Sequence, residues 1–433
     1  MDLIIPYLSL DIVVVAIAAI TLLSRLTFWH PFAVYLFFHI YSFTWRAYGI
    51  YTGDPLMYEG QLFADPISIE EIQRALLLAD LSLMMFTLGV WAAHRKYDSV
   101  EQPLTQRREL SPVWSKVIGF FCLPVGFIAM FFLKTVGVGP NVDDATTGYI
   151  QAVAMWPIGA AGLLIFVHGF RWYLVLSVSL YLSFVVFQGY HRFMFVLPIL
   201  YLVAVFLQKN RRRWPPVYLV CAMLFLGAVF PHMKQIGAAM QRGEYSNAIS
   251  LVEESFSEKK DEFGDKVRND LLDQFAGSLT LIDWNERKFM GSTYISIITL
   301  PIPRAIWPSK PGLGDHLREI STPGRNYAKQ GRIITYIGES YLNFGYYGIV
   351  IIPLIIGYIL TRFCLYADSG PTLGIARYAY LILFMTFLQA YRDGLTSLVL
   401  FSVVHNMPAA LILMIHVVPG LAPMAESRLK AVE

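Results

Sequence analysis

Five arginines lie in hydrophilic segments of a very apolar chain, and their side chains suit the binding of phosphate groups. They are Arg192, Arg304, Arg325, Arg332 and Arg392. A guanidinium stays charged and can bind two phosphate oxygens at once, so a cluster of arginines at a membrane surface suits a lipid-linked phosphate or pyrophosphate. If the pyrophosphate leaves, the same arginines stabilise the charge that grows in the transition state. Contact with lipid head groups is the simpler alternative for Arg192 and Arg392.

Groups that could accept a proton from an attacking hydroxyl are fewer. Glu339 is the first candidate, and Asp393 and His191 are neighbours in sequence of Arg392 and Arg192. A base must reach the hydroxyl proton, which depends on geometry. Glu339 and Asp393 have the equally weighted alternative of forming ion pairs with the arginines. No Gly-rich phosphate loop and no metal-binding motif occurs in these segments, so we expect neither a metal ion nor another cofactor.

The rest of the 433-residue chain has the composition of a membrane scaffold, with 56% hydrophobic and 15% charged residues. Apolar runs of roughly 18 or more residues predict transmembrane helices. We predict an all-α polytopic protein with about eleven spans. The predicted spans are 3–23, 31–51, 75–93, 113–133, 149–168, 172–188, 192–207, 215–231, 341–361, 375–391 and 395–418.

The placement of basic residues predicts the orientation. With the 94–116 loop inside, the inside segments hold 15 Lys and Arg residues. The short outside segments hold five, which are Arg46, Arg74, Lys134, Arg192 and Arg392. This bias follows the positive-inside rule, so we expect the N-terminus outside and the C-terminus inside. The predicted organisation is therefore spans one to eight in 1–231, a large outside loop at 232–340, spans nine to eleven in 341–418, and a cytoplasmic tail at 419–433.

The large loop has two parts of different character. Apolar residues recur at mostly four-residue spacing in 246–282, which predicts an amphipathic helix or pair of helices, broken near Gly264. From Arg304 to Arg332 the loop holds six basic and two acidic residues together with Pro and Gly, which favours an ordered basic segment. The loop arginines belong to this second part.

Four short sequences resemble the Wzy-type oligosaccharide repeat-unit polymerases of bacterial O-antigen, capsule and exopolysaccharide synthesis. In chain order they are Gly189-Tyr190-His191-Arg192, the stretch from Pro303 to Pro311, the block from Gly338 to Gly345 with Gly348 after it, and Arg392-Asp393-Gly394. The number of spans and the large outside loop agree with this resemblance over nearly the full length.

The resemblance implies a membrane glycosyltransferase with a GT-C-like architecture at the periplasmic face of the bacterial inner membrane. Such an enzyme moves the growing glycan from undecaprenyl pyrophosphate onto an incoming lipid-linked repeat unit, without a metal ion. It implies Arg192, Arg304 and Arg392 as phosphate contacts and Glu339 as the base or a sugar contact. The same resemblance suggests a chain-length regulator and a flippase as partners, and no nucleic acid.

Further residues near these motifs are candidates for substrate binding. The aromatic ones could stack on sugars or equally be packing residues at the membrane interface. The set is Arg325, Arg332, Lys310, Trp307, Tyr336, Tyr341, His191 and Asp393. Two other functions remain open: an O-antigen ligase, whose family usually adds a loop histidine, and a lipid-linked oligosaccharide flippase or other transporter. Transporters usually show repeat symmetry and broken spans, and neither is visible in the sequence.

Overall fold

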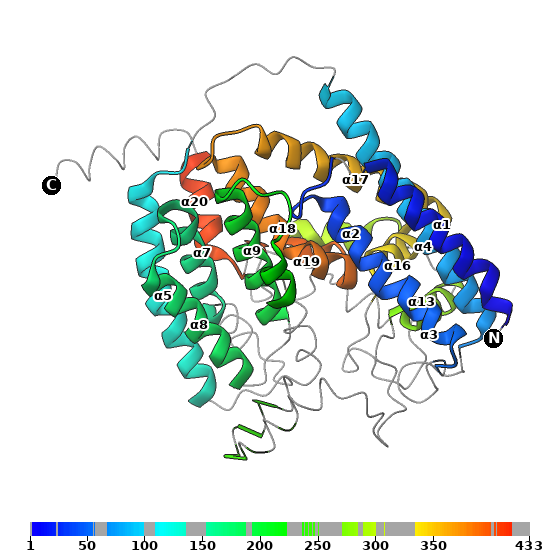
Figure 1. Ribbon diagram of the computed structural model, residues 1–433, viewed down its shortest axis with the longest axis horizontal. Coiled ribbons are helices and arrows are strands. Elements are labelled where there is room, and N and C mark those ends of the chain that lie inside the picture. The colour runs from blue at the N-terminus through cyan, green and yellow to red at the C-terminus, as the bar shows by residue number, and fades with distance from the viewer. Residues whose placement is uncertain are drawn as a thin grey trace. The chain divides into compact units, whose positions relative to one another are not determined.

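The computed structural model describes residues 2–22, 25–54, 56, 67–98, 109–135, 153–187, 193–222, 236–237, 239–240, 242–244, 246, 250, 271–284, 289–299, 307, 334–399, 402–403 and 405–417. Within these residues the regular structure is helical (Figure 1). The described α-helices are α1 (Ile5–Leu22), α2 (Pro31–His39), α3 (Trp45–Tyr51), α4 (Ile69–Asp98), α5 (Pro112–Thr135), α7 (Trp156–His168), α8 (Trp172–Phe187), α9 (Phe193–Lys209), α13 (Leu271–Trp284), α14 (Ser292–Thr299), α16 (Tyr336–Phe344), α17 (Tyr346–Asp368), α18 (Ile375–Asp393), α19 (Thr396–Val399) and α20 (Met407–Val417).

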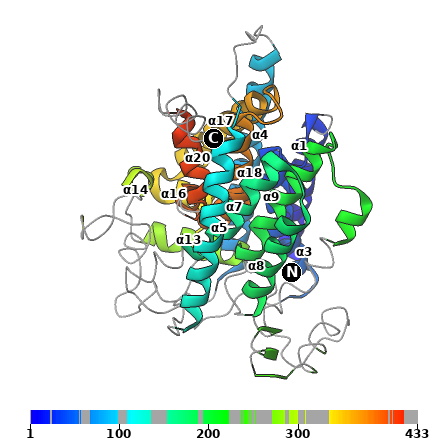
Figure 2. The ribbon, with the colours of Figure 1, turned by 90° about the vertical axis from the view of Figure 1, so that its left-hand side faces the viewer.

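The chain folds into two compact units. Unit 1 comprises Met1–Pro103, Glu262–Leu365 and Thr386–Val399, and unit 2 comprises Leu104–Asp261, Tyr366–Met385 and Leu400–Glu433. In unit 1, α4 packs against α1 and α13, and α13 also contacts α16. In unit 2, α5 and α8 both pack against α7, and these helices run side by side in two perpendicular views (Figures 1 and 2).

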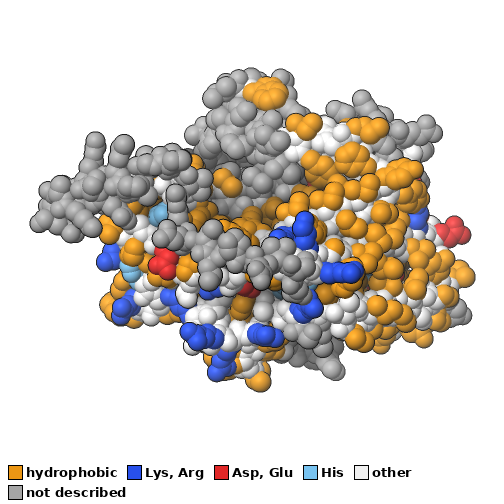
Figure 3. Space-filling model, turned by 90° about the horizontal axis from the view of Figure 1, so that it is seen from above, with side chains coloured by type: hydrophobic (Ala, Val, Ile, Leu, Met, Phe, Trp, Pro, Cys, Tyr) orange, Lys and Arg blue, Asp and Glu red, His pale blue; other side chains and the backbone are white. Residues whose placement is uncertain are grey.

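The protein is an all-α chain with the helices of a membrane protein. Among the described residues, α1, α4, α5 and α17 are the four helices long and apolar enough to cross a membrane. Helices α7, α8, α9 and α20 are apolar but shorter. Hydrophobic side chains are exposed over a broad area of the surface (Figure 3). On α1 they include Ile17 and Ile20, which are 60% and 76% exposed, as expected where lipid is the solvent.

Most predicted spans overlap a helix, but the described residues do not show eleven full-length spans, and two of the predicted spans are broken. The predicted span 341–361 begins inside α16, which ends at Phe344 with Gly345 as its C-cap, and α17 then starts at Tyr346. Gly345 has φ 62°, a left-handed conformation that ends helices readily when the residue is glycine. The predicted span 395–418 corresponds to α19 and α20, which are separate helices. The predicted span 215–231 is helical at 217–222, and its remainder lies outside the described residues.

Local sequence signals explain where several helices start. Helix α4 follows a reciprocal capping box, in which the Ser68 hydroxyl accepts from the Glu71 amide and the Glu71 carboxylate accepts from the Ser68 amide. Helix α2 has proline at its first position and is capped by the His30 ring, which accepts from the Phe32 amide. A π-helical turn, Ile40–Thr44, connects α2 to α3.

Helices α4 and α17 approach each other through glycine. A Cβ atom at Gly89 would lie 2.1 Å from the Leu354 carbonyl oxygen, and one at Gly357 would lie 2.5 Å from the Phe86 carbonyl oxygen. Small residues let backbones of neighbouring membrane helices come this close. Neither position has room for a side chain without separating the two helices.

We therefore expect Gly89→Val to destabilise unit 1 by about 1–3 kcal/mol through overpacking. Thermal unfolding of the detergent-solubilised chain would show this as a lower midpoint. Met84→Val is the matched control, because Met84 lies on the same helix and is 47% exposed. Equal midpoints for the two variants would contradict backbone contact between α4 and α17.

Candidate functional site

Helix α16 is a short polar helix buried almost along its whole length. Residues Tyr336 to Asn343 are all buried, and they include Glu339, Ser340 and Asn343. The Thr335 hydroxyl caps the helix by accepting from the Gly338 amide at 3.2 Å. Polar side chains on a buried helix must find partners inside the protein, because an unpaired buried polar group is costly. Their partners define the candidate site.

The Glu339 carboxylate is held at both oxygens and has no exposed surface. One oxygen accepts a hydrogen bond from the Thr293 hydroxyl at 3.0 Å, and the other accepts from the Leu395 amide at 2.7 Å. Burial raises the pKa of the Glu339 carboxyl to about 7, against the opposing effect of the hydrogen bonds from Leu395 and Thr293. A carboxyl group with a pKa near neutrality is well matched to proton transfer.

Asn343 orients the hydroxyl that binds Glu339. Its side-chain nitrogen donates to the Thr293 hydroxyl oxygen at 2.6 Å and to the Glu339 carbonyl oxygen at 2.8 Å. Because the Thr293 oxygen accepts from Asn343, its own proton is directed to the Glu339 carboxylate. The Asn343 side-chain oxygen accepts from the Gly291 amide at 3.0 Å, which ties the start of α14 to α16. The site is therefore preorganised around Glu339.

The turn after α18 packs against the Glu339 carboxylate. Gly394 has φ +99°, and a Cβ atom there would lie 2.7 Å from a Glu339 carboxylate oxygen. Arg392, at the end of α18, is 43% exposed, and its guanidinium lies 3.6 Å from the carboxylate of Asp393. The Gln389 amide donates to the other Asp393 oxygen. The structure thus brings the Gly338–Gly345 block and the Arg392–Gly394 turn, which are separate in the sequence, into direct contact.

A second polar group lies around Arg74. Its guanidinium is 2.6 Å from the Asp283 carboxylate and donates to the hydroxyls of Tyr341 and Tyr346 at 2.8 Å each. The Tyr341 hydroxyl donates to Asp283 at 2.6 Å. Arg74 also lies over both tyrosine rings, 5.7 and 5.6 Å from their centroids. Sequence reasoning counted Arg74 only as a loop charge and missed this role.

The remaining residues that the sequence suggested for the site differ in their surroundings. Tyr336 has no exposed surface, and its hydroxyl hydrogen-bonds to Ser82, which also contacts Tyr35, so it packs inside unit 1. Tyr341 is 2% exposed, whereas Trp307 is 39% exposed. The others lie outside the described residues: His191, Arg192, Arg304, Lys310, Arg325 and Arg332.

Sequence reasoning also missed a buried ion pair between Arg46 and Asp273. The Arg46 Nε and Nη2 atoms donate to the two Asp273 oxygens at 2.6 and 3.0 Å, and the two side chains are 2% and 0% exposed. This paired geometry joins α3 to α13, 227 residues apart. Arg46 was counted as an outside loop charge. The signal that could have found the pair is an arginine within a predicted span, which needs a buried partner.

No family model, curated protein or solved structure matches the chain. The chemistry of the site therefore follows from its geometry. Glu339 can hold or release a proton near neutral pH, and Arg392, near the end of α18, carries a partly exposed guanidinium beside the Asp393 carboxylate.

The raised pKa of Glu339 predicts a pH-dependent stability. The unfolded chain releases this proton near its ordinary pKa of 4.5, whereas the folded protein retains it up to about pH 7. Stability should therefore fall as pH rises through this window, by on the order of 3 kcal/mol. Glu339→Gln should remove that loss, because an amide does not ionise; its oxygen can accept from the Leu395 amide, and its nitrogen can donate to the Thr293 hydroxyl oxygen. Thermal unfolding across the window measures the difference, with the exposed Glu109→Gln as control. Parallel pH profiles for wild type and Glu339→Gln would refute it.

The buried ion pair predicts a large effect of a small change. Asp273→Asn leaves the Arg46 charge buried without its carboxylate, which should destabilise the protein by about 3–5 kcal/mol. Asp54 offers a matched control, since its carboxylate is 3.7 Å from the same guanidinium but 63% exposed. Asp54→Asn should cost less than about 1 kcal/mol. Chemical unfolding of both variants in detergent would test the contrast, and similar losses would show that burial does not decide the effect.

Proposed function

We propose that the protein is a repeat-unit polymerase of bacterial surface polysaccharide. In the proposed reaction, a sugar hydroxyl of the incoming lipid-linked repeat unit attacks the anomeric carbon of the growing glycan. The bond from that carbon to undecaprenyl pyrophosphate breaks, and a glycosidic bond forms. The hydroxyl proton passes to a base, and the pyrophosphate leaves with its negative charge.

The observation that carries this proposal is the contact between Glu339 and the turn after Arg392. It joins a carboxyl group whose pKa is about 7 to the turn that directly follows Arg392 and Asp393. In the proposal Glu339 accepts the hydroxyl proton, and Arg392 stabilises the departing pyrophosphate together with Arg192 and Arg304. Both oxygens of Glu339 are occupied, so action as a base requires the Leu395 amide or the Thr293 hydroxyl to give way to substrate. Gly394, which precedes Leu395, has φ +99°, a conformation that glycine adopts readily.

The membrane arrangement in this proposal follows the charge pattern. About eleven spans, a periplasmic N-terminus and a cytoplasmic C-terminus in the inner membrane leave the 232–340 loop in the periplasm. That arrangement corresponds to a GT-C-like glycosyltransferase. In the proposal the glycosyl transfer itself proceeds without a metal ion. The loop residues Arg304, Lys310, Arg325 and Arg332 then lie on the side of the membrane where the lipid-linked substrates are. A chain-length regulator and a flippase are the proposed protein partners.

Arg392→Lys tests the role of the guanidinium. Lysine keeps the charge but cannot make the paired hydrogen bonds of arginine to a pyrophosphate. Loss of a charged hydrogen bond of about 1.5–3 kcal/mol corresponds to a roughly 10- to 100-fold slower transfer. In a deletion strain complemented with this variant, the surface polysaccharide should run on a gel as single or few repeat units rather than as a ladder.

Arg212→Lys is the control, because Arg212 is exposed and lies in a predicted inside loop. It should restore a normal ladder at equal protein level. A normal ladder from Arg392→Lys would refute the proposed role of Arg392. Deletion that leaves lipid-linked units inside and none at the surface would favour a transporter. Long polymer that remains on its lipid carrier would favour a ligase.

A further inference from the structure

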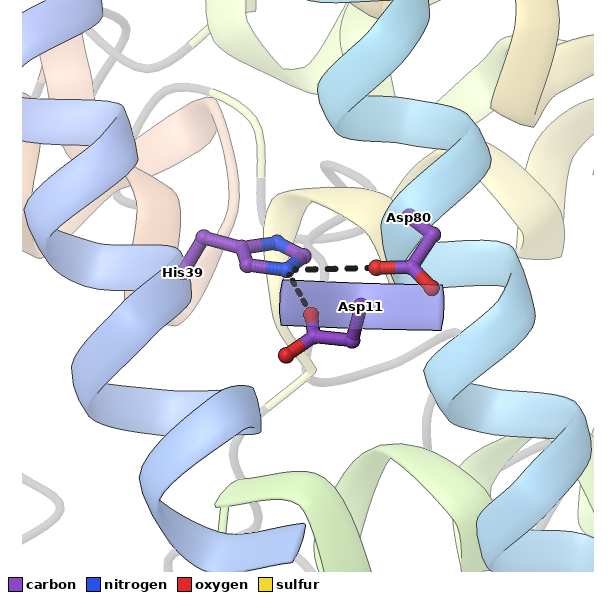
Figure 4. A group of neighbouring side chains, drawn as sticks. All are labelled: Asp11, His39 and Asp80. Carbon is purple, nitrogen blue, oxygen red and sulfur yellow. Dashed lines mark hydrogen bonds and ion pairs between the residues drawn. The ribbon is translucent and has the colours of Figure 1, made fainter. Parts of the chain in front are cut away.

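Three buried ionisable side chains meet inside unit 1, away from the loop segments in which sequence reasoning sought a metal motif. They are Asp11 on α1, His39 at the end of α2 and Asp80 on α4 (Figure 4). The His39 Nε2 atom is 2.7 Å from an Asp11 oxygen and 3.4 Å from an Asp80 oxygen. Asp11 and His39 have no exposed surface, and Asp80 is 3% exposed. The sequence places Asp11 and Asp80 inside predicted spans, but it gives no indication that His39 lies beside them.

This cluster contains more hydrogen-bond acceptor atoms than there are donors around it. Within the described part of the chain, the second Asp11 oxygen and both Asp80 oxygens form no hydrogen bond. In Figure 4 the Asp80 carboxylate nevertheless points into the group, toward His39 and Asp11. A protonated imidazole would balance only one of two carboxylates, and an unbalanced buried charge is costly. The oxygens of Asp80 are therefore placed for a positively charged ligand.

The donor set matches a particular class of ligand. One atom from each residue, an imidazole nitrogen and two carboxylate oxygens, lie within 4.8 Å of one another. Two carboxylates and one histidine bind divalent transition metals such as zinc, manganese and iron. A dication balances both carboxylates while the imidazole stays neutral. A proton shared between the two carboxylates would occupy two of these three oxygens and leave the third without a hydrogen bond.

The backbone next to His39 is also unusual. His39 immediately precedes the π-helical turn Ile40–Thr44, and the chain then continues as α3. A π turn adds one residue to a helical turn and occurs frequently at functional sites. Here it separates two buried polar contacts on the same stretch of chain, His39 with Asp11 and Asp80, and Arg46 with Asp273.

We propose that Asp11, His39 and Asp80 bind one divalent transition-metal ion, which ties α1, α2 and α4 together. Ionisable residues inside membrane helices commonly bind ions or carry protons. The site does not depend on the polymerase proposal, because its ligands are separate from Glu339 and Arg392. Its expected effect is on metal content and on the stability of unit 1.

The test uses the full chain, purified in detergent with an affinity tag that contains no histidine. After incubation with zinc or manganese and dialysis, mass spectrometry of the metal should find about one ion per chain. Asp80→Asn and His39→Gln should each lower this content at least about tenfold, since each removes one of three ligands. Asp54→Asn and His168→Gln are matched controls outside the cluster and should keep the metal.

Wild-type measurements keep the test decisive if a cluster variant fails to fold. Cobalt substitution should give visible d–d absorption, and a chelator should lower the thermal midpoint of wild type but not of the metal-free protein. Metal content near zero after incubation with zinc and with manganese would overturn the proposal and favour a proton-sharing network. Equal metal content in wild type and Asp80→Asn would also overturn it.

Discussion

The hydrogen bond from the Leu395 amide to the Glu339 carboxylate joins parts of the chain that are 56 residues apart. It follows from one constraint, that a buried polar group must find a partner inside the protein. Helix α16 is buried from Tyr336 to Asn343, so the constraint applies to every polar side chain on it. Thr293 and Asn343 satisfy it on one side, and the turn after α18 satisfies it on the other. The arrangement of unit 1 around α16 depends on these contacts.

The same constraint is met differently at two other buried groups of unit 1. Arg46 and Asp273 pair through two hydrogen bonds and balance each other, which is what a structural ion pair requires. Asp11, His39 and Asp80 do not reach balance, because two carboxylates face one imidazole and three carboxylate oxygens have no hydrogen bond within the described residues. Both groups are buried, and they differ in charge balance: the Arg46–Asp273 pair is balanced, whereas the cluster proposed to bind a metal ion is not.

The surface and the interior of unit 1 have opposite character. Helices α1 and α17 expose isoleucine, leucine and valine, whereas the interior holds carboxylates, histidines and an arginine. In such surroundings electrostatic interactions are stronger than in water, which is how burial can raise the pKa of Glu339 to about 7. The proposed glycosyl transfer uses this raised pKa of Glu339.

The sequence by itself determined the membrane character and the positions of most helices, because apolar runs and caps such as Ser68 with Glu71 are local properties. It also singled out the Gly338–Gly345 and Arg392–Gly394 motifs, but it left open whether Glu339 pairs with arginine or acts as a base. Only the tertiary structure decided that Glu339 contacts Thr293 and Leu395, that Arg46 binds Asp273, and that His39 joins Asp11 and Asp80. Each of these contacts joins distant parts of the chain, and the choice of partner depends on helix packing, which no local pattern of residues contains.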